Sequence, residues 1–285
     1  MPSSENILVT GATGQVGRAV LDELRSIGAP VRAGARTPGK LSVSGDVEVV
    51  PADLTEPATL SAALEGVDKV FLYAVPQGVF DFLSAAQVAG VKHIVVLSSQ
   101  TVVDNFPAQE PIVEMHRVVE KAVVDSAIPY TFLRPHNFAT NILMWGWGES
   151  IRETGRLRFP YPDSHSDAVH EKDIAEVAAK VLTEPGHEGR SYFVSGPESI
   201  TQRRQLEVIA EVTGRPLRFD ELTPEQAHTE LAPYVPEWVR AAVFGYWAAS
   251  NGVPTDLSDD VKKITGHPAR SFAEWVADHI EEFTP

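Results

Sequence analysis

Residues 7–17 read Ile-Leu-Val-Thr-Gly-Ala-Thr-Gly-Gln-Val-Gly, and this stretch decides the fold of the chain. A short apolar strand runs directly into Gly11, Gly14 and Gly17, and apolar residues then recur at helical spacing. A glycine-rich turn between a strand and a helix lets backbone N–H groups approach a pyrophosphate, and the helix N-terminus adds the positive end of its dipole. The spacing is GxxGxxG rather than GxGxxG, so it is the flanking strand and helix that make the glycines predict a dinucleotide site.

Short apolar runs continue to alternate with helical stretches along the chain. The runs are continuous rather than alternating, which is typical of strands in a parallel sheet covered on both faces. We therefore predict an α/β fold, a Rossmann doubly wound parallel sheet with a smaller, mostly helical C-terminal substrate lobe. The predicted strands are residues 7–9, 30–35, 47–50, 69–73, 93–97, 130–133 and 192–194, and the predicted helices include 16–27, 59–65, 79–89 and 113–126.

The pattern changes after Arg134-Pro135, where it becomes helical and aromatic. It returns to a strand near Tyr192, and from Gln202 onward it is almost wholly helical. We therefore expect two interleaved parts. The predicted dinucleotide-binding domain comprises residues 1–136 and 166–197, and the predicted substrate-binding lobe comprises residues 137–165 and 198–285.

Composition excludes several classes of function. The 285 residues include 24 basic and 39 acidic side chains, a formal charge of −15, and no cysteine. An acidic surface repels nucleic acid and anionic lipid, and the lack of cysteine excludes disulfides, thiolate catalysis and cysteine-ligated metals. No apolar stretch approaches membrane-spanning length, and the first residues carry no basic signal region. We expect a cytoplasmic monomer or homodimer that binds a small-molecule substrate, without nucleic-acid or membrane partners.

The end of the second predicted strand distinguishes NAD from NADP. NAD is gripped there by an acidic side chain, yet no Asp or Glu occurs from Leu24 to Gly45. The same stretch holds Arg32, Arg36 and Lys40, and Arg36 lies just past the strand. A guanidinium at that place can bind a 2′-phosphate through two hydrogen bonds, so we expect NADP(H).

With these features the chain resembles the NmrA-like branch of the atypical short-chain dehydrogenases/reductases. The resemblance extends over nearly the whole chain and is carried by Val-Thr-Gly-Ala-Thr-Gly-Gln-Val-Gly at 9–17, Val-Arg-Ala-Gly-Ala-Arg at 31–36, Ala-Asp-Leu at 52–54, Val-Val-Leu-Ser-Ser at 95–99, Ile-Pro-Tyr-Thr-Phe-Leu-Arg-Pro at 128–135, Asp-Ile-Ala at 173–175, Gly-His-Glu-Gly-Arg at 186–190 and Thr-Gly-His-Pro at 265–268.

The resemblance implies how the cofactor lies. Asp53 would lie near the adenine, residues 74–76 would pass under the ribose and nicotinamide, and Ser98 and Ser99 would border the reactive ring. His136 follows a strand at its carboxyl end, where ligands bind in open α/β sheets. The predicted cofactor-binding residues are Thr10, Gly11, Thr13, Gly14, Gln15, Val16, Arg36, Lys40, Asp53, Leu54, Ala74, Val75, Pro76, Ser98, His136, Asn137 and Phe138.

The Tyr-x-x-x-Lys pair usual in short-chain dehydrogenases is missing. The corresponding helix has His116 at the tyrosine position and Glu120 at the lysine position. Histidine titrates near neutrality and can pass a proton to an oxygen that gains charge, so His116 is the candidate catalytic acid. Its alternatives are ribose binding or a structural role.

Aromatic residues in the second lobe suggest a flat pocket. The predicted substrate-contacting residues are Ser99, Gln100, Trp145, Phe159 and Tyr161. His165, Asp167 and His170 lack the spacing of a known metal site, so we expect no metal.

Two functions remain open from the sequence. The first is an NADPH-dependent reductase that transfers hydride to a small, flat, electron-poor substrate such as a quinone or a conjugated carbonyl compound, because such products need little acid catalysis. The alternative is a non-catalytic NADP(H)-binding redox sensor of the NmrA type, which the loss of Tyr and Lys also fits. An isomerase or epimerase is disfavoured without the tyrosine.

Overall fold

A parallel sheet forms the centre of the molecule. The computed structural model describes residues 5–43, 45, 47–73, 75–103 and 111–285, and within them the sheet has seven strands in the order β3-β2-β1-β4-β5-β6-β9. The order reverses between β1 and β4, which is the point where open α/β sheets bind ligands at the carboxyl ends of their strands. The strands are β1 (Ile7–Val9), β2 (Val31–Ala35), β3 (Glu48–Pro51), β4 (Lys69–Tyr73), β5 (His93–Leu97), β6 (Tyr130–Pro135) and β9 (Arg190–Val194).

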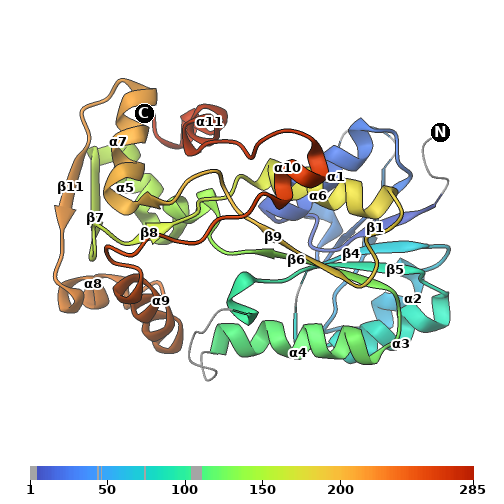
Figure 1. Ribbon diagram of the computed structural model, residues 1–285. Coiled ribbons are helices and arrows are strands. Elements are labelled where there is room, and N and C mark those ends of the chain that lie inside the picture. Colours follow the sequence, from blue (N-terminus) through green and yellow to red (C-terminus); the bar gives the residue numbers. More distant parts are fainter. Residues whose placement is uncertain (1–4, 44, 46, 74, 104–110) are drawn as a thin grey trace.

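Helices cover both faces of this sheet (Figure 1). One face is covered by α1 (Gln15–Ser26) and α6 (Glu171–Thr183), and the other by α2 (Leu60–Ala63), α3 (Val79–Ala89) and α4 (Pro111–Asp125). The predicted doubly wound Rossmann fold is therefore confirmed.

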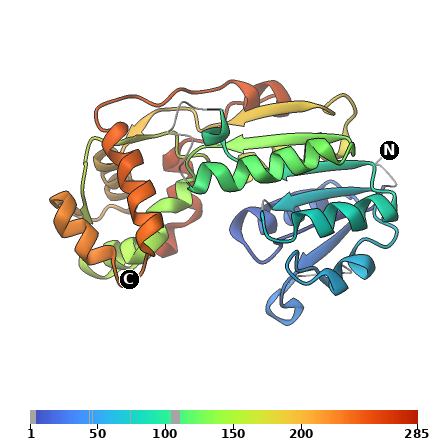
Figure 2. The same ribbon diagram turned by 90° about the horizontal axis from the view of Figure 1, so that it is seen from below.

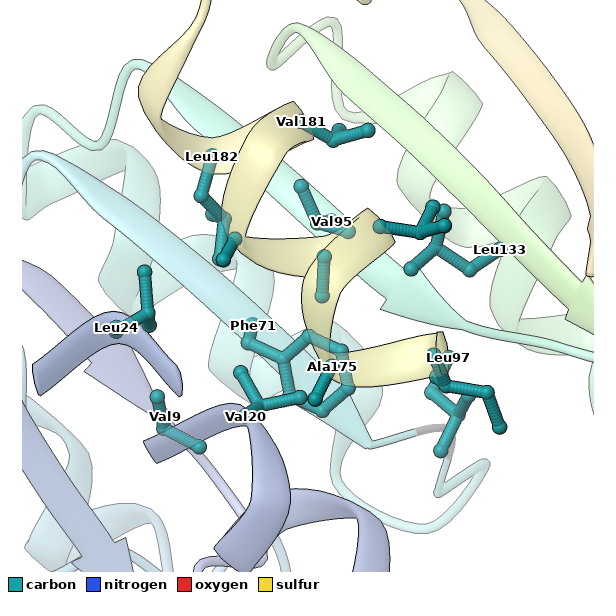
Figure 3. Packing of buried hydrophobic residues seen from close by; sticks show 14 of the residues in the cluster. Val9, Val20, Leu24, Phe71, Val95, Leu97, Leu133, Ala175, Val181 and Leu182 are labelled. Atoms are coloured by element: carbon teal, nitrogen blue, oxygen red, sulfur yellow. The ribbon is translucent and has the colours of Figure 1, made fainter. Parts of the chain in front are cut away.

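Alternate side chains of each strand enter different cores. Val95 and Leu97 of β5 lie in the core under α1 and α6, which Figure 3 shows from close by, whereas Ile94 and Val96 lie in the core under α3 and α4. All four are buried. Burial on both faces is the physical reason why these strands read as continuous apolar runs.

The remaining elements form a second part beside the sheet (Figure 2). The buried aromatic side chains of its core include Phe159, Trp247 and Trp275. The elements are η4 (Ala139–Gly146), α5 (Trp147–Thr154), β7 (Arg156–Phe159), β8 (His165–Ser166), β10 (Ile200–Thr201), α7 (Gln202–Thr213), β11 (Arg218–Glu221), α8 (Pro224–Leu231), α9 (Glu237–Ala249) and α11 (Phe272–Asp278), and α10 (Asp260–Thr265) packs on α6.

The described chain after Gln202 is helical as expected, with one strand that was not predicted. That strand, β11, pairs in parallel with β7, and the short strand β10 before Gln202 pairs antiparallel with β8. The sequence of β11, Arg-Phe-Asp-Glu, has a single apolar residue because the strand lies at the surface, so no apolar run marks it. The predicted helix 59–65 is also shorter, because Pro57–Thr59 form a 3-10 turn before α2.

The C-terminal segment ties the second part back to α6. Arg270 pairs with Asp173 and Glu176 of α6, and Trp275 Nε1 of α11 donates to Glu171 Oε2 at 2.9 Å. None of the helices in the described ranges is both long and apolar enough to cross a membrane.

Candidate functional site

The glycine loop is shaped by close backbone approach. Gly11 has φ +64°, a left-handed conformation that favours glycine, and a Cβ at Gly17 would lie 2.2 Å from the Gly11 carbonyl oxygen. The helix α1 therefore begins tight against the loop. Its N-cap, Gly14, makes no side-chain capping bond, so the first N–H groups of the helix stay available to an anion.

A groove of about 660 Å³ runs along this loop and across the carboxyl ends of β1, β2 and β4. Most of the predicted cofactor residues line it. They are Thr10, Gly11, Thr13, Gly14, Gln15, Val16, Arg36, Asp53, Leu54, Val75 and Phe138, together with Gly17 of the predicted glycine loop. Ala52, Thr55, Tyr73, Leu97, Thr140, Asn141, Leu143 and Met144 also line the groove and were not predicted to contact the cofactor.

Other predicted cofactor residues lie elsewhere. Lys40 is exposed in the 3-10 turn Pro38–Lys40, and neither Lys40 nor Pro76 lines the groove. Ala74 lies outside the described residues. Ser98, His136 and Asn137 line a second cavity instead.

Arg32, Arg36 and Lys40, the three cations of the acid-free stretch weighed for phosphate binding, have separate surroundings. Arg32 Nε pairs with Glu48 at 2.7 Å, and its guanidinium also donates to the carbonyls of Ala63 and Glu65. Its side chain is therefore bonded to neighbouring elements at the edge of the sheet. Arg36 alone of the three lines the groove. The residues present thus fit a 2′-phosphate, because the groove offers a guanidinium at the end of β2 where an NAD site has a carboxylate.

Asp53 also lines the groove and is held in a turn. Thr55 donates to Asp53 Oδ1 through its backbone N–H at 2.9 Å and its hydroxyl at 2.8 Å. These bonds, and the nearby charge of Arg36, lower the pKa of Asp53, so it is ionised at neutral pH. An ionised carboxylate in this place can accept hydrogen bonds from an adenine amino group or a ribose hydroxyl.

The second cavity, of about 360 Å³, lies between the sheet and the second part. Its aromatic side is built from Trp145, Trp147, Phe159 and Trp247, with ring centroids 4.5 Å apart for Phe159 and Trp247. Trp145 has φ +53°, an uncommon conformation for a bulky residue, and its ring meets Trp147 edge-on. Tyr161 packs on this core and Gln100 lies in the turn after β5, and neither lines the cavity.

The two cavities adjoin. Tyr73, Leu97, Phe138, Asn141 and Met144 line both of them. Of these, Leu97 is the last residue of β5, and Phe138 lies three residues beyond the end of β6. A ligand that extends along the groove from the glycine loop would therefore reach residues that also line the aromatic cavity.

His116 lines the aromatic cavity from α4. Its Nδ1 is buried and has no hydrogen-bond partner among the described residues. Burial lowers its pKa, with Glu120 opposing that shift, so the ring is neutral at pH 7. A neutral ring offers one donor and one acceptor to a ligand but no imidazolium proton.

The Glu120 carboxylate is used in hydrogen bonds with other side chains of the protein. It accepts from Arg134 through both oxygens, at 2.9 Å and 2.6 Å, and from Ser98 Oγ at 2.6 Å. The residue at the lysine position is thus part of a buried ion pair that joins α4 to β6.

Polar side chains also line the aromatic cavity, namely those of His136, Asn137 and Tyr246, and they contact the buried Asp167 behind them or one another. Asn137 Nδ2 donates to Tyr246 Oη at 2.6 Å, and Asn137 N donates to Asp167 Oδ1 at 3.0 Å. His136 Nδ1 lies 3.8 Å from the same Asp167 oxygen. Sequence reasoning named Tyr246 only as an aromatic residue and Asp167 only as a metal candidate, because the hydrogen bond to Tyr246 joins segments 109 residues apart.

The three residues weighed as metal ligands serve different partners. His165 Nδ1 lies 2.9 Å from Ser199 Oγ, His170 Nε2 lies 3.2 Å from Asp278 Oδ2, and Asp167 binds Asn137. No cluster of three metal-ligating side chains occurs in the part of the chain that the structure describes.

Comparison with known proteins gives the family. A family of domains described as NAD(P)H-binding matches residues 11–185. The chain belongs to this NAD(P)H-binding family. That result confirms the resemblance to the atypical short-chain dehydrogenases/reductases.

Individual relatives cover the whole length. The chain is 44% identical to a (4-alkanoyl-5-oxo-2,5-dihydrofuran-3-yl)methyl phosphate reductase of Streptomyces griseus, covering 98% of this chain and 99% of the relative. It is 35% identical to an NAD(P)H azoreductase of Xenophilus azovorans, covering 97% and 99%. Among solved structures, the NADPH-dependent quinone oxidoreductase of Escherichia coli in complex with NADPH superposes with a TM-score of 0.80 at 27% identity, covering 96% of this chain and 99% of that one.

Proposed function

We propose that this chain is an NADPH-dependent reductase that transfers hydride to a small, flat, electron-poor acceptor. The observation that carries the proposal is the meeting of the two cavities, because it brings the end of a dinucleotide groove to an aromatic-lined pocket. Bound NADPH would supply the hydride. The glycine loop, Arg36 and Asp53 would hold the cofactor, and the aromatic rings would hold a flat acceptor by stacking.

The chemistry of the pocket favours a conjugated carbonyl compound. The Streptomyces griseus relative is named for an oxo-dihydrofuran that carries an alkanoyl group, in which the ring double bond is conjugated to carbonyls. The Escherichia coli structure is named for quinones. Both are flat acceptors whose reduction places negative charge on oxygen, and His116 would hydrogen-bond such an acceptor as a neutral donor.

The substrate of this chain should lack a phosphate group in the aromatic cavity. Among the described residues, no Lys or Arg lines that cavity, and residues 104–110 contain no basic residue in the sequence. A phosphate normally needs Arg, Lys or a cluster of N–H donors. We therefore expect an uncharged acceptor.

The decisive experiment measures NADPH oxidation with a panel of quinones, acyl dihydrofuranones, simple enones and azo dyes. We expect turnover with at least one conjugated carbonyl compound, with deuterium from 4-deuterated NADPH appearing on carbon in the product. Tight NADPH binding without turnover of any acceptor would instead support the redox sensor. The aromatic cavity beside the cofactor groove favours the reductase, because it offers space for an acceptor.

A further inference from the structure

Tyr246 reaches the end of β6 from a distant helix. It is carried by α9 and lines the aromatic cavity together with Asn137, which directly follows the strand end and His136. Asn137 precedes Phe138, which lines both cavities. The phenol is therefore held close to the place where the groove and the cavity meet.

The hydrogen bonds around Asn137 fix the direction of the amide. Asn137 Nδ2 lies 3.3 Å from Asp167 Oδ1 and 2.6 Å from Tyr246 Oη. Asp167 is fully buried, burial raises its pKa to about 6, and its Oδ1 also accepts from the Asn137 backbone N–H at 3.0 Å. A carboxylate only accepts hydrogen bonds, so it is the amide nitrogen, with two N–H donors, that faces both partners.

Tyr246 is consequently the acceptor in its bond with Asn137. Its hydroxyl hydrogen is therefore not used in the bond with Asn137. The bond also stabilises the phenolate, because an N–H donor of Asn137 already points at the oxygen that would carry the charge. Asp167 and Asn137 thus prepare Tyr246 to give up a proton.

The two histidines of the cavity are poorer acids. Burial lowers the pKa of both His116 and His136, against the opposing charges of Glu120 and Asp167, so both rings are neutral at pH 7. The ring of His136 meets that of Tyr246 edge-on at 5.2 Å, which restricts the phenol ring to one orientation.

We propose that Tyr246 is the proton donor of the reduction and replaces the tyrosine that α4 lacks, with Asn137 and Asp167 as its positioning residues. This inference rests on the proposed function. When hydride adds to the β-carbon of a conjugated carbonyl substrate, the electron pair of the double bond moves to the carbonyl oxygen. The Tyr246 O–H bond then breaks, the proton passes to the enolate, and the phenolate takes a proton from water. NADPH is oxidised to NADP⁺, so charge and electrons balance.

Two variants test the donor. Tyr246→Phe removes the hydroxyl alone, and Tyr234→Phe is the matched control, because Tyr234 is 70% exposed and lines neither cavity. With an enone, we expect kcat of Tyr246→Phe to fall by about 10²-fold, the usual size of general acid catalysis. With a quinone, whose reduced anion is delocalised and is protonated by water, we expect a fall of less than about threefold.

The positioning role has its own readout. Asn137→Ala should lower kcat for the enone by a larger factor than kcat for the quinone, and the double variant should be no worse than the more impaired single variant. A purely structural role for Asn137 would reduce both activities together.

A binding measurement keeps the test independent of turnover. A saturated lactone is added to the cofactor-free protein, and calorimetry should show roughly 5-fold to 10-fold weaker binding to Tyr246→Phe than to wild type, the usual worth of one hydrogen bond. Equal binding and equal enone kcat in the Tyr246→Phe and Tyr234→Phe variants would overturn the inference and leave the reductase intact. Wild-type protein inactive with every acceptor would overturn the proposed function itself, and the lactone titration would still decide whether Tyr246 binds a carbonyl.

Discussion

Glu120 and Arg134 form a largely buried two-point ion pair, with Arg134 Nε and Nη2 at 2.9 Å and 2.6 Å from the two carboxylate oxygens. The Glu120 side chain is 9% exposed and that of Arg134 is 16% exposed. The pair joins helix α4 to strand β6. Glu120, which the sequence predicts at the position of the short-chain lysine, therefore binds the protein scaffold.

Removing one partner of this pair should destabilise the protein. We expect Glu120→Ala to lower the free energy of unfolding by about 3 to 5 kcal/mol, because it leaves the Arg134 guanidinium buried and unpaired. Urea denaturation measures the loss. Asp125→Ala is the control, since the Lys121–Asp125 pair lies on the same helix but is exposed, and its loss should cost less than about 1 kcal/mol. Equal losses in the two variants would contradict the prediction.

Glycine 17 should be indispensable to the loop. A methyl group at Gly17 would lie 2.2 Å from the Gly11 carbonyl oxygen, so Gly17→Ala must push α1 away from the loop. We expect NADPH affinity to fall at least tenfold, measured by titration of nucleotide fluorescence. Gly39→Ala is the control, because a methyl group there meets no atom within 4 Å and the residue has no left-handed φ. Unchanged affinity in Gly17→Ala would show that the loop does not bind the cofactor.

Arg36 should determine the choice of cofactor. Arg36→Ala removes the guanidinium that lines the groove, and we expect Kd for NADPH to rise roughly 10-fold to 100-fold while Kd for NADH changes little. Lys40→Ala should change neither constant much, since Lys40 is exposed and lines no part of the groove. Calorimetry with both nucleotides checks this. A parallel loss of NADH and NADPH binding would contradict recognition of the 2′-phosphate.

Stability should fall as pH rises above the ordinary pKa of histidine. His279 Nε2 lies 2.9 Å from Glu171 Oε1, and this bond raises the pKa of His279 above its usual 6.5. A raised pKa contributes stability that is complete below pH 6.5 and is lost as pH rises through the folded pKa. We therefore expect His279→Gln to lower Tm at about pH 6 and to lower it much less at about pH 9. Thermal unfolding at both pH values measures it, and an equal loss at both would assign the effect to packing of the His279 ring on Trp275.

Glu171 makes stability depend on pH in the acidic range, with the opposite sign to His279. Burial alone would raise the pKa of Glu171, but the hydrogen bonds with His170 and His279 outweigh the effect of burial. They keep the pKa below its usual 4.5. Its stabilisation is present above pH 4.5 and is lost as pH falls through the folded pKa. The C-terminal attachment to α6 should therefore be most stable between about pH 4.5 and pH 6.5, where both groups are charged.

The sequence by itself determined the fold, the glycine loop and the position of Arg36. These follow from local patterns, because continuous apolar runs, helical periodicity and a glycine turn are each encoded within a few residues of one another. It also located His116 and Glu120 relative to the short-chain motif. The surface strand β11 was not predicted, because most of its residues are polar and its pairing with β7 is not local.

The tertiary structure alone decided the polar side of the cavity. Tyr246, Asn137 and Asp167 come from α9, the end of β6 and the segment after β8, and no periodicity in the sequence links them. Their meeting depends on how the second part packs beside the sheet. Tertiary packing also separated Arg32 from Arg36, because one guanidinium pairs with Glu48 while the other remains in the groove. The sequence states which chemical group each residue carries, but packing between distant segments determines which groups meet.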